Sequence, residues 1–112
     1  QREYATNAVR TGTHFMQRLH GLARDYPCIG EVRGKGLMIG MELIEADAER
    51  TPARALCEAI VTRAYHNGLL LLSCGTSTVR FMPPLSVSEA EIDEAVALLR
   101  MSLDEALAGR RA

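Results

Sequence analysis

The stretch EVRGKGLMIGMEL, residues 31–43, decides the fold because apolar side chains recur at every second position of its second half. The apolar set is Leu37, Ile39, Met41 and Leu43, and the positions between them are Met38, Gly40 and Glu42. A two-residue period places the two sets on opposite faces of a β-strand. Glycines before and within the run remove side chains from one side, which permits a bulge or the close approach of another backbone. We therefore predict one strand over residues 31–43.

Long helices are expected at both ends of the chain. Apolar residues recur at three- and four-residue steps between residues 2 and 26, which predicts an amphipathic helix that ends before Pro27. Near the other end, Ser88 and Glu91 have the spacing of a capping box, in which each side chain accepts a hydrogen bond from the other residue's backbone amide. A last helix should follow the box and fray near Gly109.

A third helix and two short strands are expected in the middle of the chain. Thr51-Pro52 is typical of an N-cap followed by the first helical residue, and Asn67-Gly68 suits the left-handed conformation that ends a helix. Residues 69–73 and 78–82 then read as two strands joined by a tight connection at 75–77. The middle of the chain thus contributes a helix and a hairpin.

These elements predict an α/β fold of the α+β type, in the order α-β-α-β-β-α. Each strand and helix has one apolar face, so a small three-stranded sheet packed against helices is the natural arrangement. We expect the last strand to lie in the middle of the sheet. That order makes all neighbours antiparallel, because a helix joins the first two strands and a hairpin joins the last two.

The composition describes one globular domain, residues 1–112. Of the 112 residues 47% are hydrophobic, and 13 basic side chains face 14 acidic ones, so the net charge of −1 argues against a nucleic-acid or anionic-membrane surface. The longest apolar run, residues 69–72, is far shorter than the roughly 20 residues of a membrane-spanning helix. The chain begins with Gln1, and we expect it to be a piece of a longer polypeptide.

The cysteines and histidines suggest no metal site. Cys28, Cys57 and Cys74 are widely spaced and odd in number, which favours free thiols and a reducing, cytoplasmic location. The three histidines, at positions 14, 20 and 66, lie on expected helices without the spacing of metal ligands. Lys35 is the only lysine, but it lies between two glycines, where a wet and flexible turn would not lower its pKa for Schiff-base chemistry.

Arg80 is the strongest candidate for a binding residue. On the strand at 78–82 its side chain should lie on the face opposite Val79 and Phe81. A guanidinium among apolar residues needs a planar anionic partner, because it is always charged and offers a rigid fork of donors. Two partners fit at this point: an internal carboxylate, most simply Glu42, or the carboxylate of a substrate.

Three stretches together resemble one known family. They are IGEVRGKGLMIGMEL at 29–43, NGLLLLSCG at 67–75 and TVRFMPPL at 78–85. In this order they resemble the C-terminal segment of class III aminotransferases, pyridoxal-phosphate enzymes of fold type I, and the 4-aminobutyrate aminotransferases most of all. The resemblance covers essentially the whole chain.

The resemblance implies that this chain is the small C-terminal domain of a larger, homodimeric enzyme. In that family the lysine that forms the internal aldimine and most other cofactor ligands belong to the large domain, so no catalytic or cofactor-binding residue carries over, and Lys35 matches the glycine-rich motif instead. Arg80 matches the family's arginine for the substrate carboxylate. The implied reaction moves an amino group from 4-aminobutyrate or another ω-amino acid to 2-oxoglutarate, and the chain alone should be inactive.

Beside the 4-aminobutyrate aminotransferases that the chain resembles, the connection between Cys74 and Arg80 is short, so the resemblance leaves the substrate open. Acetylornithine and ornithine aminotransferases and amino-acid racemases of the same class share the layout. From the residues alone, a free-standing module that binds a small carboxylate for regulation, or an interaction domain that packs its glycine-rich strand on a partner protein, also fits.

Overall fold

The computed structural model describes residues 2–35, 38–45, 47–83 and 86–111, and the side chains of residues 7–34, 38–45, 47–83 and 86–110. The elements in chain order are α1 (Arg2–Asp25), β1 (Ile29–Lys35), β2 (Met38–Leu43), α2 (Arg54–His66), β3 (Leu72–Cys74), β4 (Thr78–Phe81) and α3 (Glu89–Arg111). The α+β class predicted from the sequence is confirmed. Of the helices in these ranges, none has the length and apolarity needed to span a lipid bilayer.

The four strands form one sheet in the order β1-β2-β4-β3, and every neighbouring pair is antiparallel. The last strand, β4, lies between β2 and β3, as predicted. It pairs with β2 from Ile39 opposite Phe81 to Glu42 opposite Thr78, and with β3 on its other side. The position of β4 at the inside of the sheet gives its backbone hydrogen-bonding partners on both edges.

The prediction of a three-stranded sheet with one strand over residues 31–43 is wrong in the number of strands. This stretch is a hairpin of β1 and β2, in which Lys35 lies opposite Met38. Residues 36 and 37, which separate these partners in the sequence, lie outside the described residues. The alternation continues through the hairpin, which is why it resembled a single strand. The expectation that Leu37 is buried lies outside the described residues.

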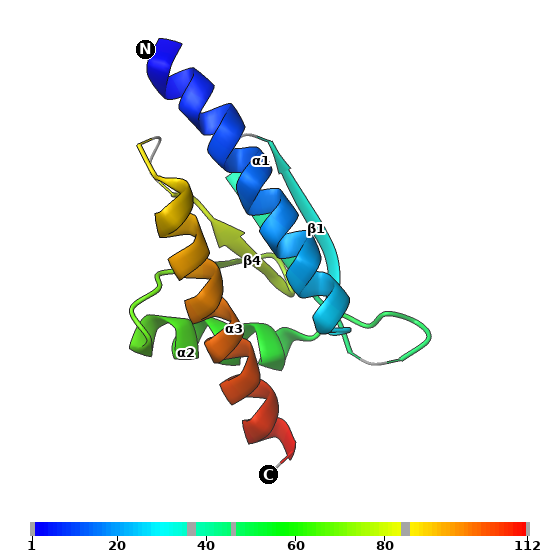
Figure 1. Cartoon of the computed structure of the whole chain (residues 1–112). Helices are drawn as coiled ribbons and strands as arrows, with labels where there is room; N and C mark the ends of the chain where they lie inside the picture. The colour runs from blue at the N-terminus through cyan, green and yellow to red at the C-terminus, as the bar shows by residue number, and fades with distance from the viewer. Residues whose placement is uncertain (1, 36–37, 46, 84–85, 112) are drawn as a thin grey trace.

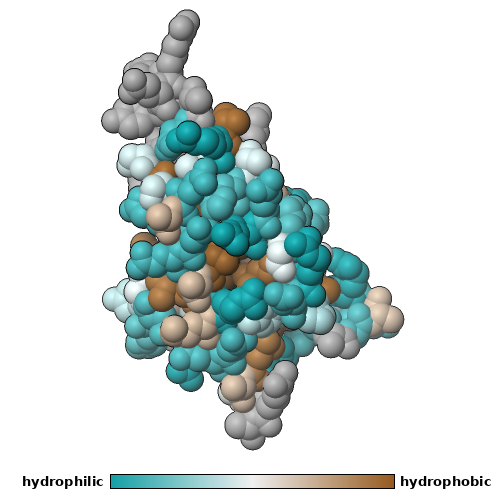
Figure 2. All heavy atoms as spheres, in the orientation of Figure 1, coloured by the Kyte–Doolittle hydropathy of each residue, from teal (hydrophilic) through white to brown (hydrophobic). Residues whose placement is uncertain are grey.

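All three helices cover the same face of the sheet, and the core lies between them (Figure 1). α1 packs against β1 and α3, and α2 packs against α3 and the β2, β4 and β3 strands. The rings of Phe15 on α1 and Phe81 on β4 meet edge to face with centroids 5.2 Å apart. The largest fully buried side chains come from every layer: Leu19, Leu22, Ile39, Met41, Leu43, Leu56, Ile60, Val79, Ile92, Leu99 and Leu103. The helical side of the molecule is mostly hydrophilic on its outer surface (Figure 2).

The capping box of α3 is confirmed, whereas the N-cap expected for α2 is not. The Glu91 amide donates to Ser88 Oγ at 3.1 Å, and the Ser88 amide donates to Glu91 Oε1 at 2.9 Å. Thr51 instead belongs to a loop, where its amide donates to Asp47 Oδ1 at 2.9 Å. Pro52 forms an isolated bridge with Ile44, so α2 begins later, at Arg54.

Residues 67–69 complete the end of α2. Gly68 has φ +92°, as expected for a left-handed helix terminus, and the Leu69 amide donates to the Ala64 carbonyl at 2.7 Å. Because Leu69 is still bonded to the helix, β3 begins at Leu72 and not at residue 69. The connection at 75–77 matches the prediction, and Gly75 adopts φ +63° there.

Candidate functional site

The side chain of Arg80 projects from the sheet face that carries no helix. Its neighbours on β4, Val79 and Phe81, are 0% and 4% exposed because they face the core, whereas Arg80 is exposed. The sequence alternation predicted this orientation correctly. It also treated the arginine as a charge among apolar residues, and this part is wrong, because the sheet is covered on one face only and Arg80 reaches solvent.

Arg80 belongs to a row of residues that crosses all four strands. On one side it is opposite Leu72 of β3, and on the other it is opposite Gly40 of β2, which is in turn opposite Arg33 of β1. Antiparallel partners point to the same face of a sheet, so Arg33 and Arg80 share the helix-free face with only a glycine between them. The next row contains Cys74, Thr78 and Glu42.

An open hollow of about 370 Å³ lies on this face around Arg80. Its lining residues come from all four strands and the β3–β4 turn: Arg33, Gly34, Met38, Ile39, Gly40, Cys74, Gly75, Thr78 and Arg80. The hollow combines two cationic side chains with small and apolar ones. Such a surface can hold a small anion with an aliphatic body.

The guanidinium of Arg80 donates from Nη2 to the Sγ of Cys74 at 3.0 Å. No ion pair joins Arg80 to Glu42, although both side chains lie in the described part of the chain. The internal partner considered from the sequence is therefore not the one that Arg80 uses. Because a thiol is a weak acceptor, the charge of Arg80 remains available to an anion from outside.

Neither Arg33 nor Cys74 was identified from the sequence as part of a site. Cys74 was expected to be one of three unpaired thiols, and all three are free. Arg33 and Cys74 reach the hollow around Arg80 because β1 pairs with β2 and β3 pairs with β4. The period-two alternation gives the face of each residue but not the residue opposite it, so only the register identifies these neighbours.

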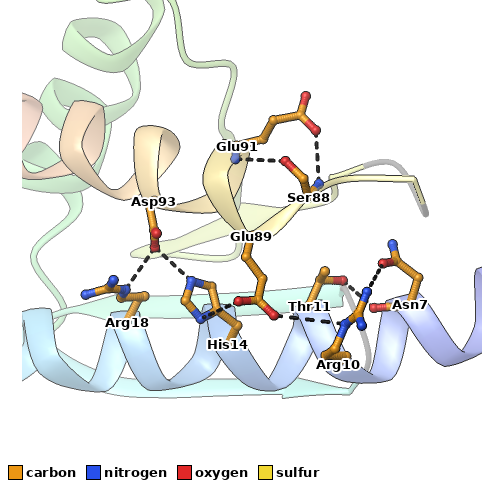
Figure 3. A network of polar contacts seen from close by, with 9 residues as sticks. All are labelled: Asn7, Arg10, Thr11, His14, Arg18, Ser88, Glu89, Glu91 and Asp93. Carbon is orange, nitrogen blue, oxygen red and sulfur yellow. Dashed lines mark hydrogen bonds and ion pairs between the residues drawn. The ribbon is translucent and has the colours of Figure 1, made fainter.

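The other candidate residues lie away from this hollow. His14 lies between α1 and α3, where Nε2 is 2.7 Å from Asp93 Oδ1 and Nδ1 is 3.8 Å from Glu89 Oε1, as Figure 3 shows. His20 and His66 are exposed on α1 and α2. Within the described ranges, no group of three or more His, Cys, Asp or Glu side chains is arranged to hold a metal ion.

Cys28 and Cys57 also lie outside the hollow. Burial raises the pKa of the Cys57 and Cys28 thiols above the ordinary value, which is typical of unreactive structural cysteines. Lys35 is the last residue of β1. Its side chain is not among those described, so the expectation of a wet turn around it is not tested.

Comparison with known proteins identifies the family to which this site belongs. The family model for class III aminotransferases matches residues 1–103. The chain is 36% identical over 96 residues to the 5-aminovalerate aminotransferase DavT of Pseudomonas aeruginosa, covering 84% of this chain and 22% of that protein. It is also 36% identical over 112 residues to a leucine/methionine racemase of Thermococcus litoralis, covering 98% of this chain and 25% of the racemase.

A solved structure agrees with these sequence matches. Lysine aminotransferase from Mycobacterium tuberculosis, in its internal aldimine form, superposes with a TM-score of 0.79 and 36% identity, covering 89% of this chain and 21% of that one. The chain thus spans about a quarter or less of the length of the relatives it matches. Matching family model, sequence relatives and fold together show that the chain belongs to the class III aminotransferase family.

Proposed function

We propose that residues 1–112 are the C-terminal small domain of a pyridoxal-phosphate-dependent aminotransferase, and that Arg80 binds the carboxylate of its substrates. The observation that carries this proposal is the position of Arg80, which is exposed in a hollow on the helix-free face and, among the described residues, bonds to a thiol and to no carboxylate. Family membership and the short span of the match, 22% of the aminovalerate enzyme, support a larger parent protein.

The proposed reaction moves an amino group from 4-aminobutyrate or another ω-amino acid to 2-oxoglutarate. Support for an ω-amino donor comes from the relative that acts on 5-aminovalerate, whose amino group is also terminal. The residues of this chain can supply recognition of the carboxylate end, since a guanidinium binds a carboxylate through two parallel hydrogen bonds. Both reactants carry a carboxylate, so one anchor serves both halves of the reaction.

The described residues do not make a site for pyridoxal phosphate by themselves. The cofactor needs a lysine amine. The only lysine of the chain is Lys35, and its side chain is not among those described. α2 begins at Arg54 with no side-chain cap on its first amides and no glycine-rich loop before it. When bound by the rest of the enzyme, the cofactor supplies an electron sink. This chain contributes a wall of the site and its carboxylate anchor.

The contacts of Arg80 suit it to hold a carboxylate in a fixed orientation. A guanidinium carries five N–H donors in one plane, and the Nη2 contact with Cys74 uses one of them. The donors that remain can bind both oxygens of a carboxylate. β4 lies inside the sheet, bonded to β2 and β3, so the base of the Arg80 side chain is held on a rigid element.

Racemisation of an amino acid is the second candidate function. The leucine/methionine racemase matches over 112 residues, a longer stretch than the aminotransferase relative. A racemase also binds the carboxylate of its substrate, so the anchor would serve it equally well. The two reactions differ in their need for a 2-oxo acid, since transamination requires an acceptor and racemisation does not.

The full-length protein is proposed to be a cytoplasmic homodimer. Three free cysteines support a reducing compartment, because disulfides are rare there. Light scattering of the purified full-length protein would test the dimer, and a monomeric mass at micromolar concentration would contradict it.

Steady-state kinetics of the full-length enzyme with Arg80→Ala test the proposed anchor. Loss of a charge-assisted hydrogen bond costs roughly 1.5–3 kcal/mol, so kcat/KM for 2-oxoglutarate should fall about 10- to 150-fold. Arg54→Ala, which removes an exposed arginine of α2 that lies 3.7 Å from Glu58, is the matched control and should change little. An Arg80→Ala enzyme that keeps wild-type kcat/KM would refute the anchor.

The same enzyme assayed with and without 2-oxoglutarate separates the two reactions. A transaminase should convert 4-aminobutyrate or 5-aminovalerate only when the acceptor is present. Conversion of an L-amino acid into its D-form without any acceptor would favour the racemase and contradict the aminotransferase.

A further inference from the structure

A groove of about 340 Å³ lies between α1 and α3, on the helical side of the molecule and across the sheet from Arg80 (Figure 1). Its α1 lining comes from two neighbouring stripes, residues 17, 21 and 24 and residues 18, 22 and 25, whose members are three or four positions apart. α3 adds Val96 and Arg100, which are one turn apart. We call this concavity the α1–α3 groove.

Positive charge dominates the lining of the α1–α3 groove. Arg18, Arg24 and Arg100 place three guanidinium groups around it, whereas Asp25 is the one carboxylate among its lining residues. The lining is therefore net positive, although the whole chain has a net charge of −1. A local excess of positive charge on a concave surface attracts small anions.

Carboxylates of the chain occupy two of the three guanidinium groups only in part. Arg18 donates from Nε to Asp93 Oδ1 at 2.9 Å, and Arg100 donates from Nη2 to Asp25 Oδ2 at 3.0 Å. The Arg100 guanidinium also lies over the Tyr26 ring, 5.4 Å from its centroid, which holds the group beside the groove. Because a guanidinium carries five N–H donors, both arginines keep donors for a ligand.

Arg24 is the arginine of the groove that has no such partner. Within the part of the chain whose side chains are described, no hydrogen bond or ion pair reaches its exposed guanidinium. A Cβ on Gly21 would be 3.6 Å from Arg24 Nη2, so the guanidinium lies against the bare backbone of the preceding turn. Its charge is therefore available to an anion in the groove.

We propose that the α1–α3 groove binds a phosphate dianion, free or as the monoester of a small molecule, with Arg24 as the main contact and Arg18 and Arg100 beside it. A phosphate group has three or more acceptor oxygens, so it can accept hydrogen bonds from guanidinium groups on both helices at once. Three arginines around one groove do not form the extended track of cations that a nucleic-acid backbone requires. This site does not depend on the role proposed for Arg80.

Chemical protection of arginines in the full-length, cofactor-loaded enzyme tests the site. Phenylglyoxal modifies exposed arginines, and mass spectrometry of the digested protein reads each position separately. Inorganic phosphate should slow the labelling of Arg24, and to a lesser extent of Arg18 and Arg100, relative to sodium chloride at the same ionic strength. Arg54 on α2, which is exposed outside the groove, is the matched control and should react equally in both salts. Equal labelling of Arg24 in phosphate and in chloride would overturn the proposal.

Two variants distinguish a built site from general attraction of anions. Arg24→Ala should raise the phosphate concentration that half-protects Arg100 about 10-fold or more, because a charge-assisted contact is lost, and Arg24→Lys should recover part of this loss. Asp25→Asn should lower that concentration, since a carboxylate in the lining repels phosphate. An unchanged concentration in both Arg24→Ala and Asp25→Asn would refute the site, and Asp25→Asn gives a reading of its own if Arg24→Ala does not fold.

The same assay with phenyl phosphate identifies the form of the ligand. Val96 offers a half-buried apolar side chain in the lining, which the organic part of a monoester can contact. Protection by phenyl phosphate at a lower concentration than inorganic phosphate would assign the groove to a monoester. Protection at an equal or higher concentration would assign it to free phosphate.

Discussion

The guanidinium of Arg80 and the thiol of Cys74 meet at 3.0 Å across the β3–β4 turn, and this contact orients the arginine that the inner strand β4 carries on the helix-free face. Cys74 pairs with Thr78, two residues before Arg80 on the same face, so the thiol approaches the arginine diagonally. Cys74, the last residue of β3, therefore acts on the proposed anchor.

Cys74→Ala should weaken carboxylate binding without abolishing it. Removal of the sulfur leaves one Arg80 N–H without its partner and allows the side chain other orientations, a loss of roughly 0.5–1.5 kcal/mol, or about 2- to 10-fold in Kd for 2-oxoglutarate. Cys74→Ser keeps an acceptor at the same position and should have a smaller effect. Calorimetry on the full-length protein measures both, and wild-type affinity in Cys74→Ala would show that the contact does not orient Arg80.

The three thiols should react with iodoacetamide in a definite order. Burial raises the pKa of Cys57 and Cys28, which lowers the fraction of reactive thiolate, and Cys57 is also only 1% exposed. Cys74 is half-buried at the edge of the hollow and should be alkylated first, Cys57 last. Mass spectrometry of digested samples over time gives the rates. Labelling of Cys57 as fast as Cys74 would contradict the packing of α2.

Gly34→Ala should destabilise the domain, whereas Gly109→Ala should not. A Cβ on Gly34 would lie 2.8 Å from Ile39 Cγ1 and 3.2 Å from the Met38 carbonyl oxygen, so the hairpin must shift, at a cost of about 1–3 kcal/mol. A Cβ on Gly109, in the last turns of α3, meets nothing within 4 Å, and alanine there should stabilise the helix by up to about 1 kcal/mol. Urea unfolding compares the two variants directly. Equal stability of Gly34→Ala and wild type would mean that β1 is not packed as described.

Asp93 should make the stability of the domain sensitive to acid. Hydrogen bonds from His14 at 2.7 Å and Arg18 at 2.9 Å lower the pKa of the Asp93 carboxyl below its ordinary value (Figure 3). The unfolded chain then binds this proton more readily than the folded one. The contribution of Asp93 is therefore complete above the ordinary pKa of about 3.9 and is lost as pH falls through the lower folded value.

Thermal unfolding between pH 7 and pH 3 tests this dependence. Asp93→Asn should melt below the wild type at pH 7, and the difference should shrink toward pH 3. Glu94→Gln removes the same charge from the next residue of α3 and serves as the control. A constant difference between Asp93→Asn and wild type at all pH values would exclude the proposed linkage.

Features that depend on local sequence were mostly predicted well, the Thr51 cap of α2 excepted, and features that depend on register were not. The Ser88–Glu91 capping box, the left-handed Gly68 and the outward face of Arg80 each require only a few neighbouring residues. The hairpin of β1 and β2 was missed because a two-residue alternation reads the same through a reversal of the chain as along one strand. Arg33 and Cys74 line the hollow because of how the strands pair, and the two-residue alternation of the sequence does not reveal strand pairing.

The partner of Arg80 illustrates the same limit. Glu42 was a reasonable choice because it shares the less apolar face of its strand, and β2 does pair with β4. The register places Gly40, not Glu42, opposite Arg80, and Glu42 opposite Thr78. A shift of two residues in a pairing between segments about 40 residues apart thus decides between an internal ion pair and an open anchor.

The place of β4 inside the sheet also has a consequence for synthesis of the chain. β2 leaves the ribosome well before Phe81, the last residue of β4. Until β4 is made, the hairpin of β1 and β2 has one edge of β2 unpaired. Pairing between segments so distant in sequence is slow compared with formation of a hairpin. The nascent hairpin is therefore the part of this domain most exposed to aggregation, and a stall in translation between Leu43 and Thr78 would prolong that exposure.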